Sequence, residues 1–186
     1  MLMRIVGGNF KGKKLQKRIS KNIRPTSEFV REAIFDILEN YLDFANKNVL
    51  DLFAGTGLLG IEALSRGADF CQFVDKSKSS IEILKSFLEE LAVVKSKYKI
   101  THSDVFSFLN TYQNERKFNV IFADPPYETN LFKKLIENPN LEKVAKKGTI
   151  FVFETHSKFV FENVDWLELK QKKIYGDTAI FFFEYK

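Results

Sequence analysis

The stretch Val49-Leu50-Asp51-Leu52-Phe53-Ala54-Gly55-Thr56-Gly57 decides the fold that this sequence predicts. Its first residues form a short apolar run that ends in turn residues, a pattern typical of a buried strand. Gly55, Gly57 and Gly60 satisfy G-x-G-x-x-G. That pattern alone is weak, but here it follows a strand and opens a helix, and glycines let a backbone approach a ligand closely. We therefore expect a strand, a ligand-binding turn and a helix over residues 48–66.

Strand-like and helix-like segments alternate along the rest of the chain. Further strands are expected at 70–74, 98–101, 118–123 and 148–154, and helical segments at 79–94, 106–109 and 131–136. Such alternation predicts an α/β fold with a mostly parallel sheet covered by helices on both faces. The tail, 167–175 and 178–185 around Gly176-Asp177, is typical of an antiparallel pair.

The first residues have a different character. Residues 1–22 carry glycines and a run of lysines and arginines, and we interpret them as a basic β-hairpin extension. The main domain is expected over residues 23–186. It would begin with a helix over 26–42, because Thr26 or Ser27 can cap the helix and an apolar stripe follows.

Composition narrows the class of protein. The chain has 186 residues and a formal net charge of +5, which is compatible with a polyanionic partner. Its one cysteine, Cys71, forms no disulfide framework, so a reducing cytoplasm fits. No apolar run reaches the length of a membrane span, and the first residues do not resemble a signal peptide. His102 and His156 are the only histidines, and the sequence shows neither a Ser-His-Asp set nor a Cys/His metal cluster.

Acidic residues follow the predicted strands. Asp75 ends the second strand and could accept hydrogen bonds from ribose hydroxyls. Asp51 could receive an ammonium group and would repel a pyrophosphate, which favours a methyl donor with an amino-acid tail over a dinucleotide. Asp104 could bond an adenine amino group. The structural alternatives are a turn acceptor for Asp51, a helix cap for Asp75 and a cap of the 105–109 turn for Asp104.

The sequence Asp124-Pro125-Pro126-Tyr127 follows the strand expected at 118–123. Neither proline has an N–H, so the strand must end there, and Asp124 is pushed into an extended conformation because it precedes a proline. The result is a stiff corner that presents a carboxylate, carbonyl groups and an aromatic face. Such a corner could accept hydrogen bonds from an amino group while a flat base stacks on Tyr127, which indicates chemistry on an exocyclic amine. The alternative is a rigid loop with an incidental aspartate.

Together, residues 51–57 and 124–127 resemble class I S-adenosylmethionine-dependent methyltransferases that modify exocyclic amines. The N-terminal Arg4-Ile5-Val6-Gly7-Gly8 with Gly12-Lys13-Lys14-Leu15, then Arg24-Pro25-Thr26 and Val30-Arg31-Glu32, resembles more specifically the RsmD family, as does Tyr175-Gly176-Asp177-Thr178. Members of that family methylate N2 of a guanine in bacterial 16S ribosomal RNA. The resemblance covers nearly the whole chain.

The resemblance implies a Rossmann-like class I methyltransferase fold. Its sheet would be mostly parallel and seven-stranded, with helices on both faces, a C-terminal antiparallel hairpin and the small N-terminal β-hairpin. The implied reaction is of the guanine(966)-N2 type, with S-adenosyl-L-methionine as methyl donor, S-adenosyl-L-homocysteine as product and no metal. The implied partner is 16S ribosomal RNA, free or within an assembled 30S subunit or late precursor. We expect a cytoplasmic monomer that has no contact with a membrane.

The resemblance also assigns residues. The catalytic corner would be Asp124, Pro125, Pro126 and Tyr127. The cofactor would be bound by Asp51, Phe53, Ala54, Gly55, Thr56, Gly57, Asp75, Lys76, Asp104, Val105 and Asp124. RNA would be contacted by Lys11, Lys13, Lys14, Arg24 and Arg31, with packing near the cofactor as the alternative for Arg31.

Other functions are compatible with parts of this pattern. A DNA adenine-N6 methyltransferase uses the same proline corner but would need a DNA-reading domain that this chain does not show. A glutamine-N5 protein methyltransferase usually carries Asn where this chain has Asp124. A cofactor-binding RNA-assembly factor without activity would not need an intact corner, and an NAD dehydrogenase is disfavoured by Asp51.

Overall fold

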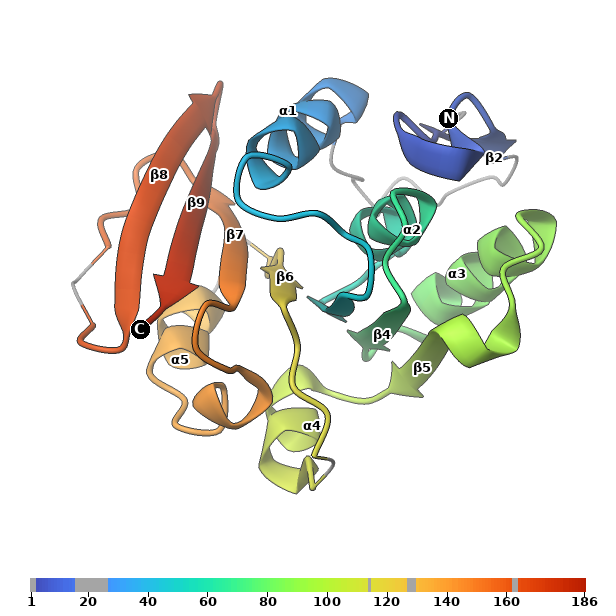
Figure 1. The fold of residues 1–186 in the computed structure, drawn as a ribbon. Coiled ribbons are helices and arrows are strands. Elements are labelled where there is room, and N and C mark those ends of the chain that lie inside the picture. The colour runs from blue at the N-terminus through green and yellow to red at the C-terminus, as the bar shows by residue number, and fades with distance from the viewer. Residues whose placement is uncertain (1–2, 16–26, 114, 127–129, 162–163) are drawn as a thin grey trace.

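The computed structural model describes residues 3–15, 27–113, 115–126, 130–161 and 164–186 (Figure 1). Its centre is a seven-stranded sheet with the order β5-β4-β3-β6-β7-β9-β8. The five parallel strands are β3 (Asn48–Leu52), β4 (Phe70–Asp75), β5 (Tyr98–His102), β6 (Val120–Ala123) and β7 (Ile150–His156). An antiparallel hairpin of β8 (Leu167–Tyr175) and β9 (Thr178–Tyr185) completes one side. The predicted α/β class, the parallel sheet and the C-terminal hairpin are confirmed.

Helices cover both faces of this sheet. One apolar cluster lies on the side of α1 (Glu28–Leu38), α2 (Leu58–Ser65) and α3 (Lys78–Glu90). The other lies on the side of α4 (Val105–Thr111) and α5 (Leu131–Ile136), and Figure 1 shows the two groups of helices on opposite faces. Three short 3₁₀ helices, η1 (Gly8–Phe10), η2 (Lys95–Lys97) and η3 (Glu142–Val144), complete the described elements. Successive side chains of a strand point to opposite faces of the sheet, so each buried strand contributes apolar side chains to both clusters.

The N-terminal hairpin pairs β1 (Met3–Arg4) with β2 (Lys14–Leu15). Its apolar side chains Met3, Ile5 and Leu15 are buried in the same cluster as α1, α2 and α3. The hairpin is therefore packed into the main core. The domain boundary expected between residues 22 and 23 lies outside the described residues.

Two predicted helices are shorter than expected. The helix expected over 26–42 is helical over Glu28–Leu38, and Ser27 caps it by accepting the N–H of Val30 at 3.2 Å. The helix expected over 79–94 ends at Glu90, because Ala92 adopts a left-handed conformation with φ of 52° and the chain turns into η2. The strand expected over 118–123 begins at Val120.

Strand register brings several loops to one edge of the sheet. Leu52 of β3 pairs with Val74 of β4 on one side and with Ala123 of β6 on the other. The chain leaves β3 through α2 toward β4, and β6 lies on the opposite flank, so the crevice between β3 and β6 is the topological switch point. In open α/β sheets, ligands bind at such a point, outside the carboxyl ends of the strands.

Candidate functional site

The glycine turn follows β3 at this edge. The backbone N–H of Ala54 bonds the carbonyl of Val74 at 3.0 Å, which joins the turn to β4. Gly55 has a φ of +54°, and a Cβ there would meet only the carbonyl oxygen of Phe53, at 3.9 Å. The conformation thus favours glycine, and open space remains in front of the turn. This is the space that a ligand held by the turn would need. Phe53, Ala54 and Gly55 are half-buried, whereas Thr56 and Gly57 are buried.

Asp75 closes the turn from the neighbouring strand. Its Oδ2 accepts the N–H of Gly55 at 2.8 Å, and its Oδ1 accepts the N–H of Ser77 at 2.7 Å. Ser77, not Asp75, is the cap of α3. A carboxylate has about four lone-pair sites, so two backbone bonds orient Asp75 and leave it capacity to accept hydroxyl groups.

Asp51 lies beneath the turn and is 3% exposed. Its Oδ2 accepts the N–H of Gly60, in the first turn of α2, at 3.0 Å. Burial raises the pKa of Asp51 to about 8; the nearby Asp75 charge adds to this shift, and the bond from Gly60 opposes it. Asp51 thus accepts a backbone N–H from helix α2, whereas the structural alternative expected a turn acceptor. A cation near Asp51 would favour its ionised form.

Asp104 caps the helix that follows β5. Its Oδ1 accepts the N–H groups of Phe106 and Ser107 at 3.0 and 3.1 Å, so the capping interpretation is confirmed. Val105, in the same turn, is buried. Lys76 is exposed, and its carbonyl lies 3.0 Å from Nε2 of His102.

The proline corner follows β6. Because Leu52 and Ala123 are paired, Asp124 leaves the sheet level with Phe53 at the start of the glycine turn. Asp124 is half-buried, Pro125 is buried and Pro126 is exposed. Tyr127 lies outside the described residues. The corner and the turn are thus neighbours across the switch point.

The charges around the crevice limit the ligand that fits. Asp51, Asp75, Asp104 and Asp124 lie on or follow the carboxyl ends of four strands. Several carboxylates would repel a pyrophosphate and attract a cationic ligand that carries hydroxyl groups. The residues present therefore fit a nucleoside with a cationic tail better than a dinucleotide. In the described part of the chain, no group of three or more His, Cys, Asp or Glu residues could hold a metal ion.

A buried glutamate, Glu62, holds the basic hairpin against α2 and was not predicted from the sequence. Glu62 of α2 is fully buried and accepts the N–H of Val6 at 3.0 Å and that of Gly7 at 2.5 Å. Gly8 lies so close to α2 that a Cβ would fall 2.0 Å from the carbonyl oxygen of Ser65. The one signal in the sequence was a single carboxylate inside the apolar run that forms α2.

Arg31 is buried beside Glu62 and does not lie at the surface. It is 1% exposed, its Nε lies 3.6 Å from Oε2 of Glu62, and its Nη2 donates to the carbonyl of Arg4. Burial lowers the pKa of Arg31, and the Glu62 charge opposes that shift. The predicted contact between Arg31 and RNA is wrong, because the apolar stripe of α1 carries Arg31 inward. Arg66 also contacts Glu62, with its Nε 3.3 Å from Oε1.

The other basic residues that were predicted to contact RNA are not buried like Arg31 or are not described. Lys11, Lys13 and Lys14 are exposed, so their side chains are available to a partner. Arg24 lies outside the described residues.

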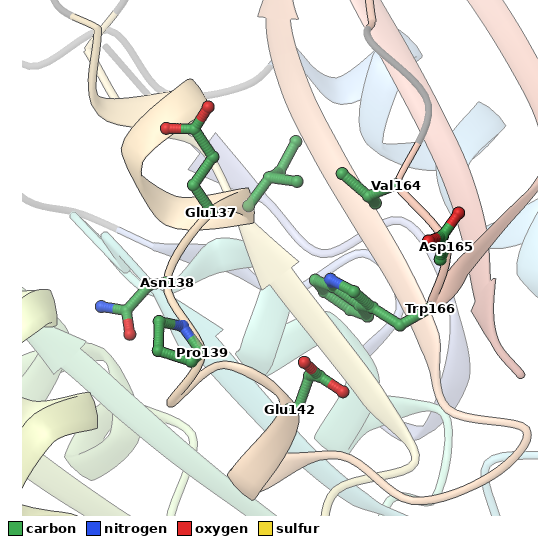
Figure 2. A pocket seen from close by; sticks show the side chains of 8 residues that line it. Glu137, Asn138, Pro139, Glu142, Val164, Asp165 and Trp166 are labelled. Atoms are coloured by element: carbon green, nitrogen blue, oxygen red, sulfur yellow. The ribbon is translucent and has the colours of Figure 1, made fainter.

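An open hollow of about 390 Å³ lies elsewhere (Figure 2). Its lining residues include Glu137, Glu142 and Trp166, from the end of α5, from η3 and from the residue before β8. The residues next to η3 lie at the amino end of β6, because the carbonyl of Val144 accepts the N–H of Phe118. The hollow is therefore at the opposite edge of the sheet from the glycine turn. Among the described residues, no helix is long and apolar enough to cross a membrane.

Comparisons with known proteins agree with this arrangement. Residues 3–184 match the family described as Conserved hypothetical protein 95. The chain is 34% identical to ribosomal RNA small subunit methyltransferase D of Buchnera aphidicola, over 90% of this chain and 86% of that protein. It is 33% identical to the protein of the same name from Escherichia coli strain K12, over 95% of this chain and 87% of that one.

A solved structure from Escherichia coli, provisionally described as a methyltransferase, superposes with a TM-score of 0.83. Its sequence is 27% identical, and the match covers 100% of this chain and 99% of the other. The predicted Rossmann-like methyltransferase fold is thus confirmed. By the extent of these matches, the chain belongs to the Conserved hypothetical protein 95 family, which is the RsmD family.

Proposed function

We propose that this protein transfers a methyl group to the exocyclic N2 amine of a guanine in bacterial small-subunit (16S) ribosomal RNA. The observation that carries the proposal is the register of β3 and β6, which sets the Asp124-Pro125 corner beside the glycine turn. The relatives named as ribosomal RNA small subunit methyltransferase D support the substrate class. The reaction would take place in the cytoplasm, on free or assembled RNA, with the protein as a monomer.

S-adenosyl-L-methionine, when bound, supplies a methyl group on a positively charged sulfur. The glycine turn would hold it in the open space before Gly55, with Asp75 accepting from the ribose and Asp51 near the ammonium. Phe53, Ala54, Thr56, Gly57, Lys76 and Val105 would complete the binding surface. Asp104 is already committed to its helix cap, and the adenine amino group would have to share that carboxylate.

The proline corner would position the guanine. The lone pair of N2 is delocalised into the ring, so the amine is a weak nucleophile. Asp124 and the carbonyl of Pro125 would accept hydrogen bonds from the NH₂ group, while Pro126 and Tyr127 would line the base. These acceptors bond the amine more strongly as it becomes positive in the transition state, so they lower the barrier and not only the ground-state energy.

The bond changes are those of an in-line displacement. The nitrogen forms a bond to the methyl carbon as the carbon–sulfur bond breaks and its electron pair goes to sulfur. The amine then loses one proton to solvent, and no strong general base is needed. Because N2 lies in the Watson–Crick edge, the guanine must be unpaired to reach the corner, as bases in RNA loops are.

The experiment is methyl transfer to small-subunit particles and to naked 16S RNA from cells that lack this protein, followed by mass spectrometry of the nucleosides. We expect N2-methylguanosine at a single position. Asp124→Ala removes the carboxylate that accepts hydrogen bonds from the amine, so it should lower kcat by roughly 100-fold or more and should reduce cofactor affinity far less. Glu137→Ala, which removes an exposed carboxylate at the opposite edge of the sheet, is the matched control.

Three results would contradict the proposal. Methylation of adenine N6 in DNA would place the protein with DNA methyltransferases. Methylation of a protein glutamine would assign a different substrate class. Cofactor binding without transfer to any substrate would indicate an assembly factor.

A further inference from the structure

The aromatic ring of Phe29 is unusually open to solvent. Phe29 is the second residue of α1 and is 68% exposed, more than any other aromatic side chain among the described residues. Its ring meets that of Tyr175 edge to face, with centroids 5.7 Å apart and planes at 86°. Tyr175 is half-buried against the core, so the pair (here called the Phe29–Tyr175 platform) is anchored on one side and exposed on the other.

The platform lies at the same edge of the sheet as the proposed site. Tyr175 pairs with Thr178, and Thr178 pairs with His156, the last residue of β7. The carboxyl end of β7 is next to that of β6, which leads into Asp124. Three strand spacings separate β6 from β8, or about 14 Å. The platform is therefore outside the catalytic corner but within reach of nucleotides that flank the target.

The charges near the platform favour a base over a phosphate on the Phe29 ring. Glu32 is exposed one turn along α1, on the same side of the helix as Phe29, and would repel a phosphate there. Lys173 of β8 is exposed two residues before Tyr175 and, by strand alternation, lies on the same face. A nucleotide could thus stack its base on Phe29 with its phosphate directed toward Lys173.

We propose that the Phe29–Tyr175 platform stacks an unpaired base that flanks the target nucleotide in the RNA substrate. This inference rests on the proposed function, because it takes the substrate to be RNA. Single exposed apolar residues are common and need no explanation alone. What distinguishes Phe29 is that its ring is held against a second aromatic ring at the edge where the substrate must arrive. Stacking of one base on an aromatic side chain contributes roughly 1–3 kcal/mol.

The test is the steady-state kinetics of Phe29→Ala with the small-subunit RNA substrate. We expect KM for RNA to rise roughly 5- to 150-fold, which is the stacking free energy expressed as a ratio. The value of kcat at saturating RNA and the affinity for S-adenosylmethionine should stay close to those of the wild type. Phe29→Trp should restore KM, and its indole fluorescence should be quenched on addition of RNA without cofactor.

Ile174→Ala is the matched control, because Ile174 is 56% exposed on the same strand as Tyr175 but on the opposite face. An unchanged KM in Phe29→Ala would overturn the platform, as would an equal rise in Ile174→Ala. A fall in kcat or in cofactor affinity with KM unchanged would show a structural role and also overturn it. Failure of the wild type to methylate RNA would instead refute the proposed function, while fluorescence of Phe29→Trp would still report whether a base stacks.

Discussion

Asp51 accepts the backbone N–H of Gly60 at 3.0 Å and so ties the end of β3 to the first turn of α2. The N–H groups in the first turn of a helix have no partner within the helix, and a side-chain oxygen can satisfy one of them. Asp51 therefore holds the glycine turn in shape from below. The same carboxylate is also expected to face the ammonium group of the cofactor.

Asp51→Asn should change how stability depends on pH. The pKa of Asp51 is raised from an ordinary value of 3.8 to about 8 in the folded chain, so between these values the folded state holds one proton that the unfolded state has lost. The free energy of unfolding then falls as pH rises through this window, by up to about 1.4 kcal/mol per pH unit. The Asp51→Asn variant should lack this fall in the free energy of unfolding, because its side chain does not titrate. Urea unfolding at pH 5, 6, 7 and 8 measures it.

The comparison is the difference between the two proteins at each pH, because their other titrating groups are shared. Asp165→Asn, which removes an exposed carboxylate, is the control. If the Asp51→Asn difference did not change with pH, Asp51 would be ionised in the folded chain throughout the range.

Gly60→Ala should destabilise the fold by roughly 1–3 kcal/mol, the usual cost of overpacking a core. A Cβ on Gly60 would fall 2.2 Å from Cε1 of Phe73 and 2.6 Å from Sγ of Cys71, both in β4. Adding Cys71→Ala should recover part of the loss, which a double-mutant cycle of unfolding free energies would detect. Strict additivity of the two changes would argue against this contact.

Glu62→Gln should cost roughly 3–5 kcal/mol, because it removes the charge that compensates the buried Arg31. The carboxylate also accepts two N–H groups of the hairpin, so the variant should expose residues 3–15 to faster hydrogen exchange. Glu62→Gln with Arg31→Met should lose less than the sum of the single changes. Glu137→Gln, which breaks the exposed pair with Lys133, is the control and should cost under about 1 kcal/mol. Equal losses in both Glu→Gln variants would mean that the buried pair contributes little.

Asp75→Ala should weaken binding of S-adenosylmethionine and S-adenosylhomocysteine roughly 10- to 100-fold, since hydrogen bonds to a charged group contribute about 1.5–3 kcal/mol. It also releases the N–H of Gly55, so the turn loses an orienting contact. Titration calorimetry measures the change, with the exposed carboxylate of Asp69 as the control in Asp69→Ala. An unchanged Kd would remove Asp75 from the cofactor site.

The sheet could be predicted from the sequence because its strands are short apolar runs that end at turn residues. Asp75 and Asp124 could be placed at the ends of strands because each directly follows an apolar run, and the parallel pairing of the strands then brings these ends to one edge of the sheet. The 167–175 and 178–185 strands were predicted at their observed bounds. The pattern of residues along each of these two strands was enough to predict them without any knowledge of their contacts.

Other features depend on contacts between distant segments and were not predictable in this way. Glu62 and the hairpin residues Val6 and Gly7 are more than fifty positions apart. Arg31 was assigned to the RNA interface from the resemblance alone, and its burial depends on Glu62, a partner thirty-one positions further along the chain. The exposure of Phe29 could not be distinguished from core packing, since an aromatic residue on a helix gives the same pattern in either place.

The exposed lysines of the hairpin should govern the salt dependence of RNA binding. The hairpin that carries Lys11, Lys13 and Lys14 is anchored by backbone N–H bonds to Glu62 and Ser65, toward the end of α2 that lies away from the glycine turn. These lysines would therefore hold RNA phosphates at a distance from the methylated nucleotide and affect binding more than catalysis. Each phosphate contact on single-stranded RNA contributes about −0.7 to the slope of log K against log salt. Lys13→Ala with Lys14→Ala should make that slope shallower by about 1.4 at unchanged kcat.

The control is Lys146→Ala with Lys147→Ala, which removes the same charge from exposed positions just before β7, at the opposite edge of the sheet. If both double variants gave the wild-type slope, the hairpin would not be part of the RNA interface; if both reduced it equally, the effect would reflect net charge alone.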